Sequence, residues 1–263
     1  MRNLRKYGQE PFSVAVIHGG PGAAGEMAPV ARELSARRGV LEPIQTATSL
    51  DAQVEELRDV LVENGETPLD LIGYSWGAWL GAILAARVPQ IVRKLILVSS
   101  GPFEERYVQQ LGATRKRRLS PAEKDEFDSV IDALGRFQAE DRDRLVSRLG
   151  TLAAKTDTYD PTPGESEPLV DVGRRGDIFR NVWRDASELR RNRGLLKLVG
   201  QVRCPVTAIH GDYDPHPSEG VRKPLAEVLP ESRFVLLDNC GHTPWRELQA
   251  REAFYRILEE ELQ

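Results

Sequence analysis

The residues LDLIGYSWGAWLGAIL, at positions 69–84, determine the fold class expected of this chain. Residues 69–73 form a short apolar run typical of a buried strand, and residues 76–84 continue as an apolar helix. Ser75 lies at the junction, between glycines that remove the side chains which would clash in a tight turn. The G-x-S-x-G pattern is weak alone, because a serine that merely caps a helix also produces it. The interpretation of Ser75 therefore depends on the rest of the chain.

Strands and helices alternate on both sides of this stretch, over residues 12–101 and again over residues 201–262. Ser49 is expected to cap one of the helices. Short apolar strands separated by helices are typical of parallel strands joined by right-handed crossovers, so the sequence predicts an α/β fold. The predicted strands are at 13–20, 40–46, 68–75, 92–100, 204–211 and 233–240, and the predicted helices at 27–39, 50–64, 76–88, 221–229 and 244–262.

Residues 104–200 have a different pattern, without strand alternation. Ser120 and Glu123 form a capping box, with Pro121 at the first helical position. We interpret the segment 104–200 as a helical cap inserted into one discontinuous core domain, which comprises residues 1–103 and 201–263. The helices predicted within the cap are at 121–134, 140–155 and 177–191.

Composition restricts the classes of function. The 263 residues carry a net charge of −4, and 40% of them are hydrophobic. Nothing in this balance would attract nucleic acid, and we interpret the basic run at residues 115–118 as a solvated helix face. No apolar stretch approaches the ~18 residues that span a bilayer, and the basic N-terminus lacks the apolar segment of a signal peptide.

The chain has two cysteines, Cys204 and Cys240. One precedes a predicted strand and the other follows the next strand, which places them at opposite ends of a parallel sheet. A strand of about six residues would separate them by roughly 20 Å, beyond the reach of a disulfide. We therefore expect a reduced, cytoplasmic protein. A monomer is the default expectation, because no interface can be recognised in the sequence.

A serine nucleophile needs a general base, a carboxylate that orients the base, and donors for the oxyanion. In an open parallel sheet these groups meet beyond the carboxyl ends of the strands. His242 fits best as the base, because it follows the last predicted strand. His18 precedes a glycine-rich turn that it is expected to organise, and His210 lies within strand sequence.

Two carboxylates, Asp212 and Asp214, follow the strand at 204–211, and the residues alone do not separate them as the acid. His210 and His216 alternate with them, which in a continuing strand would place all four on one face and suggest a metal site. A glycine and a proline within this run break the strand pattern, so we expect no metal. The constellation requires no cofactor.

Four motifs together resemble the α/β-hydrolase fold superfamily in order and spacing: HGGPG at 18–22, GYSWGA at 73–78, GDYDPHP at 211–217 and GH at 241–242. The resemblance covers residues 12–101 and 201–262. It implies an α/β-hydrolase fold, with a mostly parallel central sheet flanked by helices and a helical cap. Because His18 comes so early in the chain, we expect the N-terminal strand pair of this family to be reduced or irregular.

The resemblance also implies roles for individual residues. Ser75 is the implied nucleophile, His242 the base and Asp214 the acid, while the N–H groups of Gly20 and Trp76 form the implied oxyanion hole. The expected reaction is acyl transfer to the serine, followed by hydrolysis of the acyl-enzyme. The expected substrates are small esters, amides or short peptides. The aromatic residues expected to shape the pocket are Tyr74, Trp79, Phe103 and Trp183.

Two alternatives stay open. HGGPG and SWG resemble the prolyl aminopeptidase branch, whose members hold the substrate's amino group with carboxylates from the cap, although the elbow GYS differs from that branch's usual GGS. A protein of this fold can also be a small-ligand receptor or regulatory binder with weak or no turnover. We favour an esterase-like or amidase-like serine hydrolase. The candidate amino-binding carboxylates are Glu104, Glu105, Asp185 and Glu188.

Overall fold

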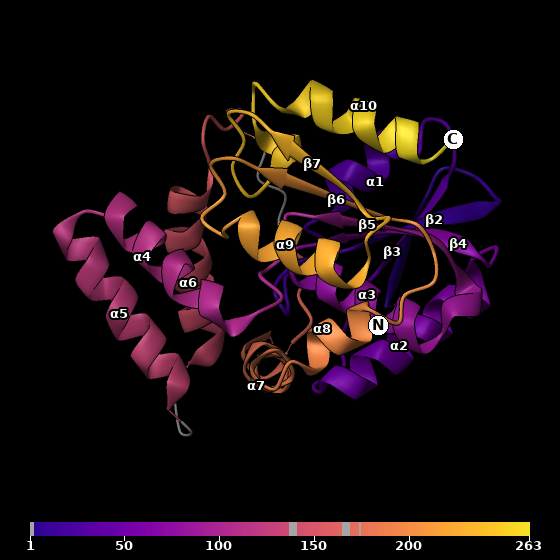
Figure 1. Cartoon of the computed structure of the whole chain (residues 1–263). Coiled ribbons are helices and arrows are strands. Elements are labelled where there is room, and N and C mark those ends of the chain that lie inside the picture. The colour runs from indigo at the N-terminus through magenta and orange to yellow at the C-terminus, as the bar shows by residue number, and fades with distance from the viewer. Residues whose placement is uncertain (1–2, 137–140, 165–168, 174) are drawn as a thin grey trace.

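The computed structural model describes residues 3–136, 141–164, 169–173 and 175–263, which form a seven-stranded sheet (Figure 1). The strand order is β1-β3-β2-β4-β5-β6-β7, and each neighbouring pair is parallel except β1 with β3. The mostly parallel sheet is therefore confirmed. The strands are β1 (Leu4–Tyr7), β2 (Phe12–Ile17), β3 (Gly39–Pro43), β4 (Leu69–Tyr74), β5 (Val92–Val98), β6 (Val206–Gly211) and β7 (Arg233–Leu237).

Helices cover both faces of the sheet, because the central strands are apolar on both sides. Ala15 and Ile17 of β2 pack in the layer that includes α2, α3, α8 and α9, whereas Val14 and Val16 pack in the layer that includes α1 and α10. The bounds of these helices are α1 (Ala28–Leu34), α2 (Leu50–Asn64), α3 (Trp76–Arg87), α8 (Gly194–Val199), α9 (Glu219–Val228) and α10 (Arg251–Glu261).

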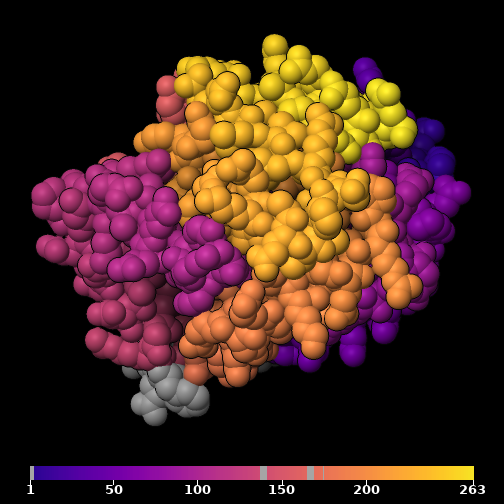
Figure 2. Space-filling model, viewed as in Figure 1, coloured from indigo at the N-terminus to yellow at the C-terminus, as the bar shows by residue number. Residues whose placement is uncertain are grey.

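The segment between β5 and β6 is helical, as predicted, and its helices α4, α5 and α6 lie at one side of the sheet (Figure 1). Within it, α6 packs against α4, α5 and α7, while α7 also contacts α2 and α8 contacts α3. The last part of the segment therefore packs on the core. In Figure 2, the first part of this segment, drawn in magenta, lies next to residues of the C-terminal part of the chain, drawn in gold. The bounds are α4 (Val108–Arg118), α5 (Pro121–Gly135), α6 (Arg142–Asp157) and α7 (Arg175–Arg191).

The two predicted helix caps are present. Ser49 accepts a hydrogen bond from the N–H of Ala52 at 3.3 Å, at the start of α2. Ser120 and Glu123 form the capping box of α5, with Pro121 in its first turn. Both caps satisfy N–H groups that the helix itself leaves without acceptors. None of the helices in the described residues is long and apolar enough to cross a membrane.

The predicted continuous helix at 244–262 is wrong: a short 3-10 helix, Pro244–Arg246, is separated from α10. The reason is Glu247, which is fully buried at the break. Its carboxylate accepts hydrogen bonds from the N–H groups of Tyr159, Asp160 and Gly241, at distances between 2.7 and 3.2 Å. These bonds connect the chain after the last strand to the residues that follow α6. They stabilise the interruption between the 3-10 helix and α10.

Candidate active site

Ser75 lies between the end of β4 and the start of α3, with φ 52° and ψ −110°. A left-handed φ at a residue other than glycine persists only where the surroundings fix it. A Cβ on Gly73 would lie 2.3 Å from the carbonyl oxygen of Gly77, and a Cβ on Gly77 would lie 2.3 Å from that of Ile17. Glycine is therefore required at both positions, and the turn holds the serine at the carboxyl edge of the sheet.

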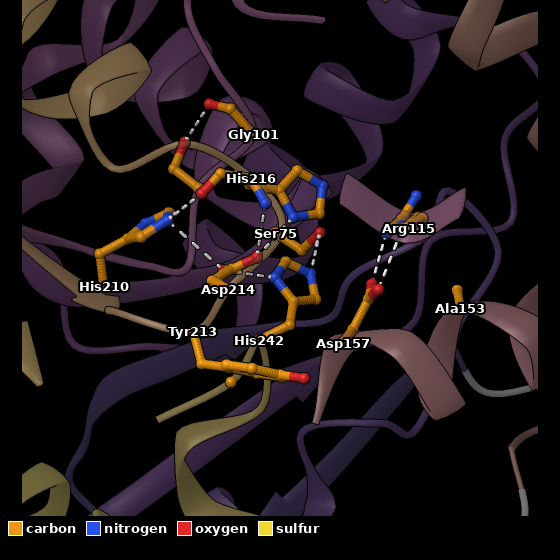
Figure 3. Close-up of polar contacts among 12 residues, drawn as sticks. Ser75, Gly101, Arg115, Ala153, Asp157, His210, Tyr213, Asp214, His216 and His242 are labelled. Atoms are coloured by element: carbon orange, nitrogen blue, oxygen red, sulfur yellow. Dashed lines mark hydrogen bonds and ion pairs between the residues drawn. The ribbon is translucent and has the colours of Figure 1, made fainter. Parts of the chain in front are cut away.

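His242 contacts both Ser75 and Asp214 (Figure 3). Its Nε2 lies 3.0 Å from the serine Oγ, and its Nδ1 lies 2.7 Å from Asp214 Oδ2. A carboxylate accepts the hydrogen of Nδ1, which leaves Nε2 as the acceptor for the hydroxyl of the serine. The structure thus brings together the three side chains expected from the sequence, each from a loop that follows a different strand.

Asp214 has a second histidine partner that sequence reasoning did not assign to this site. The N–H of His216 donates to Asp214 Oδ1 at 2.9 Å, and His216 Nδ1 lies 2.8 Å from the same oxygen. The His216 ring stacks on that of His242, with 4.3 Å between centroids. The spacing Asp-Pro-His was the available signal, because an aspartate side chain in a turn commonly accepts the N–H two residues later.

The other predicted roles near this edge can also be placed. Asp212 Oδ1 accepts from the N–H of Cys240 at 3.1 Å, so this carboxylate fixes the neighbouring loop and Asp214 is the one that contacts His242. His210 is fully buried in β6, with Nε2 2.8 Å from the carbonyl oxygen of His216. His18 Nδ1 lies 2.8 Å from the carbonyl oxygen of Gly19, within the glycine-rich turn.

The charges in this cluster depend on Asp214. Burial lowers the pKa of His242, but the Asp214 carboxylate and its hydrogen bond have the larger effect, so the pKa lies above its ordinary value. Burial raises the pKa of Asp214, and the nearby histidines outweigh burial and lower it. Burial lowers the pKa of His216 to about 4, so this ring is neutral at neutral pH and donates Nδ1–H to Asp214.

The group whose side chains lie close enough to hold a metal ion differs from the four residues that alternate in the sequence. Ligand atoms of Asp214, His216 and His242 lie within 4.8 Å of one another. However, tetrahedral ligands at about 2.1 Å from a zinc ion are separated by roughly 3.4 Å. The nitrogen-to-oxygen distances of 2.7 and 2.8 Å here are those of hydrogen bonds. The arrangement fits proton sharing better than metal binding.

Two backbone N–H groups are positioned as candidate oxyanion donors. Trp76 is the first residue of α3, so its N–H has no acceptor within the helix and lies at the positive end of the helix dipole. Gly20 lies in the HGGPG turn with φ 107°, a backbone conformation that L side chains rarely adopt. Both residues line the cavity that contains Ser75.

A cavity of about 550 Å³ lies over Ser75 and His242. Its wall includes three of the predicted pocket aromatics, Tyr74, Trp79 and Trp183. The rings of Trp79 and Trp183 are stacked, with centroids 5.8 Å apart, which joins α3 of the core to α7. The apolar part of the remaining wall comes largely from α4, α5, α6 and α7, including Leu111, Ile131, Val146, Leu149 and Phe179.

The prediction that Phe103 shapes the pocket is wrong. Its side chain is fully buried in the hydrophobic layer with α3 and α9, and it is absent from the described cavity wall. The four candidate amino-binding carboxylates are likewise absent from this wall. Three of them have other partners: Glu104 pairs with Arg106, Glu105 with Arg190, and Asp185 with Arg184.

The basic run at 115–118 is only partly a solvated face. Arg115 forms a buried ion pair with Asp157 at 2.5 Å, and the backbone carbonyl of Asp157 accepts the N–H of His242 at 2.6 Å. Arg118, three residues on and therefore on the same helix face, donates to the carbonyl oxygens of Thr156 and Tyr213. The end of α4 is thus anchored beside the loop that carries His242 (Figure 3).

Comparison with known proteins places the chain in a family. The family model described as alpha/beta hydrolase fold matches residues 14–244. A pimeloyl-[acyl-carrier protein] methyl ester esterase of Chromobacterium violaceum is 27% identical over 97% of this chain and 96% of that protein. The enzyme of the same name from Neisseria meningitidis serogroup A is 24% identical over 76% of this chain, and the match spans 59% of that relative's length.

Solved structures have the same fold. VinJ superposes with a TM-score of 0.70 at 20% identity, over 98% of this chain and 93% of that one. Proline iminopeptidase of Mycobacterium smegmatis superposes with a TM-score of 0.62 at 20% identity, over the same shares. The matched family model covers most of the chain, and the sheet order and elbow agree with the motifs that carried the resemblance. This chain belongs to the alpha/beta hydrolase fold family.

Proposed function

We propose that this protein is a serine hydrolase that cleaves small ester substrates through an acyl-enzyme on Ser75. The observation that carries the proposal is the hydrogen-bonded series of Ser75 Oγ, His242 and Asp214, with distances of 3.0 and 2.7 Å. Ser75 and His242 line a cavity, so a substrate carbonyl can reach the serine hydroxyl. The esterase names of the curated relatives support the reaction class.

The mechanism follows from the position of each proton. His242 Nε2 accepts the hydroxyl proton as Ser75 Oγ attacks the substrate carbonyl, and Asp214 stabilises the resulting imidazolium. The N–H groups of Gly20 and Trp76 donate to the developing oxyanion. The imidazolium then gives its proton to the leaving alcohol. A water molecule, deprotonated by His242, hydrolyses the acyl-enzyme and regenerates the serine.

An ester is a better candidate substrate than a peptide with a free N-terminus. An aminopeptidase of this fold needs carboxylates aimed at the substrate's amino group, and the four cap carboxylates predicted for this role are absent from the described cavity wall. Of the acidic residues that do line it, Asp157 is paired with Arg115, and burial raises the pKa of Glu26 to about 7. A prolyl-type aminopeptidase remains the alternative enzyme. A small-ligand receptor remains the alternative of another class, and turnover separates it from both enzymes. Cytoplasmic location, the monomeric state, and the division into core and cap remain predictions.

Labelling with a fluorophosphonate tests the nucleophile. We expect the probe to modify the wild type and to leave Ser75→Ala unmodified. Ser99→Ala is a matched control, because Ser99 also follows a strand with a left-handed φ of 47° but is fully buried and absent from the described cavity wall. Equal labelling of wild type and Ser75→Ala would contradict the proposal.

A substrate panel tests the reaction class with the same proteins. We expect turnover of p-nitrophenyl esters to exceed turnover of aminoacyl naphthylamides. Preference for N-terminal proline substrates would favour the aminopeptidase. Labelling of Ser75 without steady-state turnover of any substrate would favour the receptor.

A further inference from the structure

Four arginines line the cavity over Ser75, and they fall into two pairs: Arg115 with Arg190, and Arg175 with Arg246. The first two have carboxylate partners. Arg115 pairs with Asp157 at 2.5 Å, and Arg190 pairs with Glu105 at 2.8 Å. These two charges are compensated within the protein and leave little affinity for an anion.

Arg175 and Arg246 are different. The Nε of each is buried and has no hydrogen-bond partner among the described residues. Across the part of the chain that the structure describes, neither guanidinium forms an ion pair with a carboxylate within 4.0 Å. Burial without a partner is costly for a cation, and it lowers the pKa of Arg175. Both side chains therefore have donors available in the cavity wall.

The two arginines come from different parts of the fold and meet beside the glycine-rich turn. Arg175 begins α7, and its Cγ would lie 3.2 Å from a Cβ added to Gly22 in the HGGPG turn. Arg246 ends the 3-10 helix that follows His242. Both charges act on Glu26, whose carboxylate lies beside Gly19 of the HGGPG turn, so the two arginines share the part of the cavity next to the proposed oxyanion loop.

Glu26 lies in the same part of the cavity wall. Burial raises its pKa to about 7, against a backbone hydrogen bond with Gly19 and the charges of His242, Arg175 and Arg246, which lower it. Two carboxylates, Glu26 and Asp143, act on Arg175 and raise its pKa against burial. The Nε donors that lack acceptors, rather than a net charge, therefore favour an anionic ligand.

We propose that Arg175 and Arg246 form a subsite for a carboxylate of the substrate, so that the enzyme prefers esters that also carry a carboxylate. This inference rests on the proposed serine hydrolase function and adds the substrate class. Guanidinium groups donate two parallel hydrogen bonds to a carboxylate, which a neutral ester cannot accept with the same strength. A phosphate dianion fits less well, because its second charge would repel the ionised Glu26.

The residues along α7 define the part of the cavity that this substrate would occupy. Arg175, Phe179 and Trp183 recur every four residues on α7 and all line the cavity. At 1.5 Å per residue, Arg175 and Trp183 are separated by about 12 Å along the helix. A carboxylate held at Arg175 thus leaves an apolar channel beyond it, along Phe179 towards the stacked tryptophans.

Matched esters test the subsite on both sides of the scissile bond. One pair is p-nitrophenyl hydrogen adipate with p-nitrophenyl hexanoate, and the other is 4-carboxyphenyl hexanoate with phenyl hexanoate. We expect wild-type kcat/KM to favour the carboxylated member in at least one pair by roughly tenfold or more. The variants R175Q and R246Q should each lower that preference by a similar factor. R184Q is the control, because Arg184 lies on α7 with an exposed side chain outside the described cavity wall.

Each outcome decides between the proposals. Wild-type preference for the neutral member in both pairs, or an equal preference in wild type, R175Q and R246Q, would overturn the carboxylate subsite. Neither result concerns the nucleophile, because fluorophosphonate labelling of Ser75 and wild-type turnover of p-nitrophenyl hexanoate test that separately. Weaker competitive inhibition by monomethyl adipate in R175Q than in R184Q would support the subsite through binding alone.

Discussion

At the scale of single residues, the backbone explains why Ser75 could be identified from the sequence. The two glycines of the elbow are required by the approach of neighbouring backbone to less than 3 Å of where a Cβ would be, and such a requirement is visible as a residue type. His242 was found because it follows the last strand of a parallel sheet. His216 was missed because its contact with Asp214 depends on the geometry of the turn after Gly211, and the break in the strand pattern did not specify that geometry.

The carboxylate that orients His242 can be tested against its neighbour. We expect Asp214→Asn to reduce kcat/KM by about 10³–10⁴-fold, because Nδ1 loses the acceptor that fixes its tautomer. Asp212→Asn should have a much smaller effect, since an asparagine oxygen can still accept the N–H of Cys240. A larger loss of kcat/KM in Asp212→Asn than in Asp214→Asn would show that Asp212 is the acid. Steady-state hydrolysis of a p-nitrophenyl ester measures both variants.

The pH profile of these variants adds a readout specific to His242. The base must be neutral, so wild-type activity is lost as pH falls through the pKa of His242, which lies above the ordinary 6.5. Asp214 is the main group that raises this pKa, so the residual activity of Asp214→Asn should persist to lower pH. An unchanged midpoint in this variant would show that another group controls the titration.

At the scale of elements, prediction succeeded where apolar periodicity was strong. The helix at 50–64 has the same bounds as α2, and the central parallel strands were found because they are buried on both faces. The exposed helix α4 was missed, because none of its residues is fully buried and its apolar pattern is weak. The edge strand β1 is short, pairs on one side with β3 and is only partly buried, which leaves no strong pattern either.

Two helical glycines test how the elbow depends on close packing between elements. Gly77→Ala would place a Cβ 2.3 Å from the carbonyl oxygen of Ile17 in β2, so backbone must move. We expect a loss of about 3 kcal/mol in the free energy of unfolding, measured with urea, and a loss of fluorophosphonate labelling. Gly112→Ala is the matched control, because a Cβ at Gly112 in α4 meets nothing within 4 Å.

We expect Gly112→Ala to gain up to about 1 kcal/mol in the free energy of unfolding, since alanine is favoured over glycine within a helix. If both variants had similar stability, the approach of α3 to β2 would not be what fixes the elbow. If Gly77→Ala were destabilised but labelled normally, the position of Ser75 would be independent of this contact.

At the scale of the whole molecule, the cavity depends on segments that are distant in sequence. The core supplies Ser75 and His242, while the helices between β5 and β6 supply most of the apolar wall. Sequence patterns predicted the order of these segments along the chain. They could not predict which polar side chains line the cavity. Glu26, Arg175 and Arg246 carry no motif, and their common location depends on how α7 packs over the HGGPG turn.

The partly buried carboxyl of Glu26 makes the stability of the whole protein depend on this packing. In the folded protein its pKa is raised to about 7, whereas the ordinary value is 4.5. Between these values the folded state holds a proton that the unfolded state has released, so the contribution of Glu26 to stability falls as pH rises through this window. The raised pKa corresponds to a loss of up to about 3 kcal/mol by pH 8, relative to pH 4.5.

Urea denaturation at pH 4.5 and pH 8 measures this effect. Glu26→Gln cannot release a proton there, so we expect the variant to lose less stability than the wild type between the two pH values. Glu33→Gln is the control, because Glu33 is exposed on α1 and should retain the wild-type dependence on pH. The same difference between the two pH values in wild type and Glu26→Gln would mean that folding leaves the pKa of Glu26 at its ordinary value, which would contradict this coupling. Glu26 would then be ionised at neutral pH, beside the two arginines.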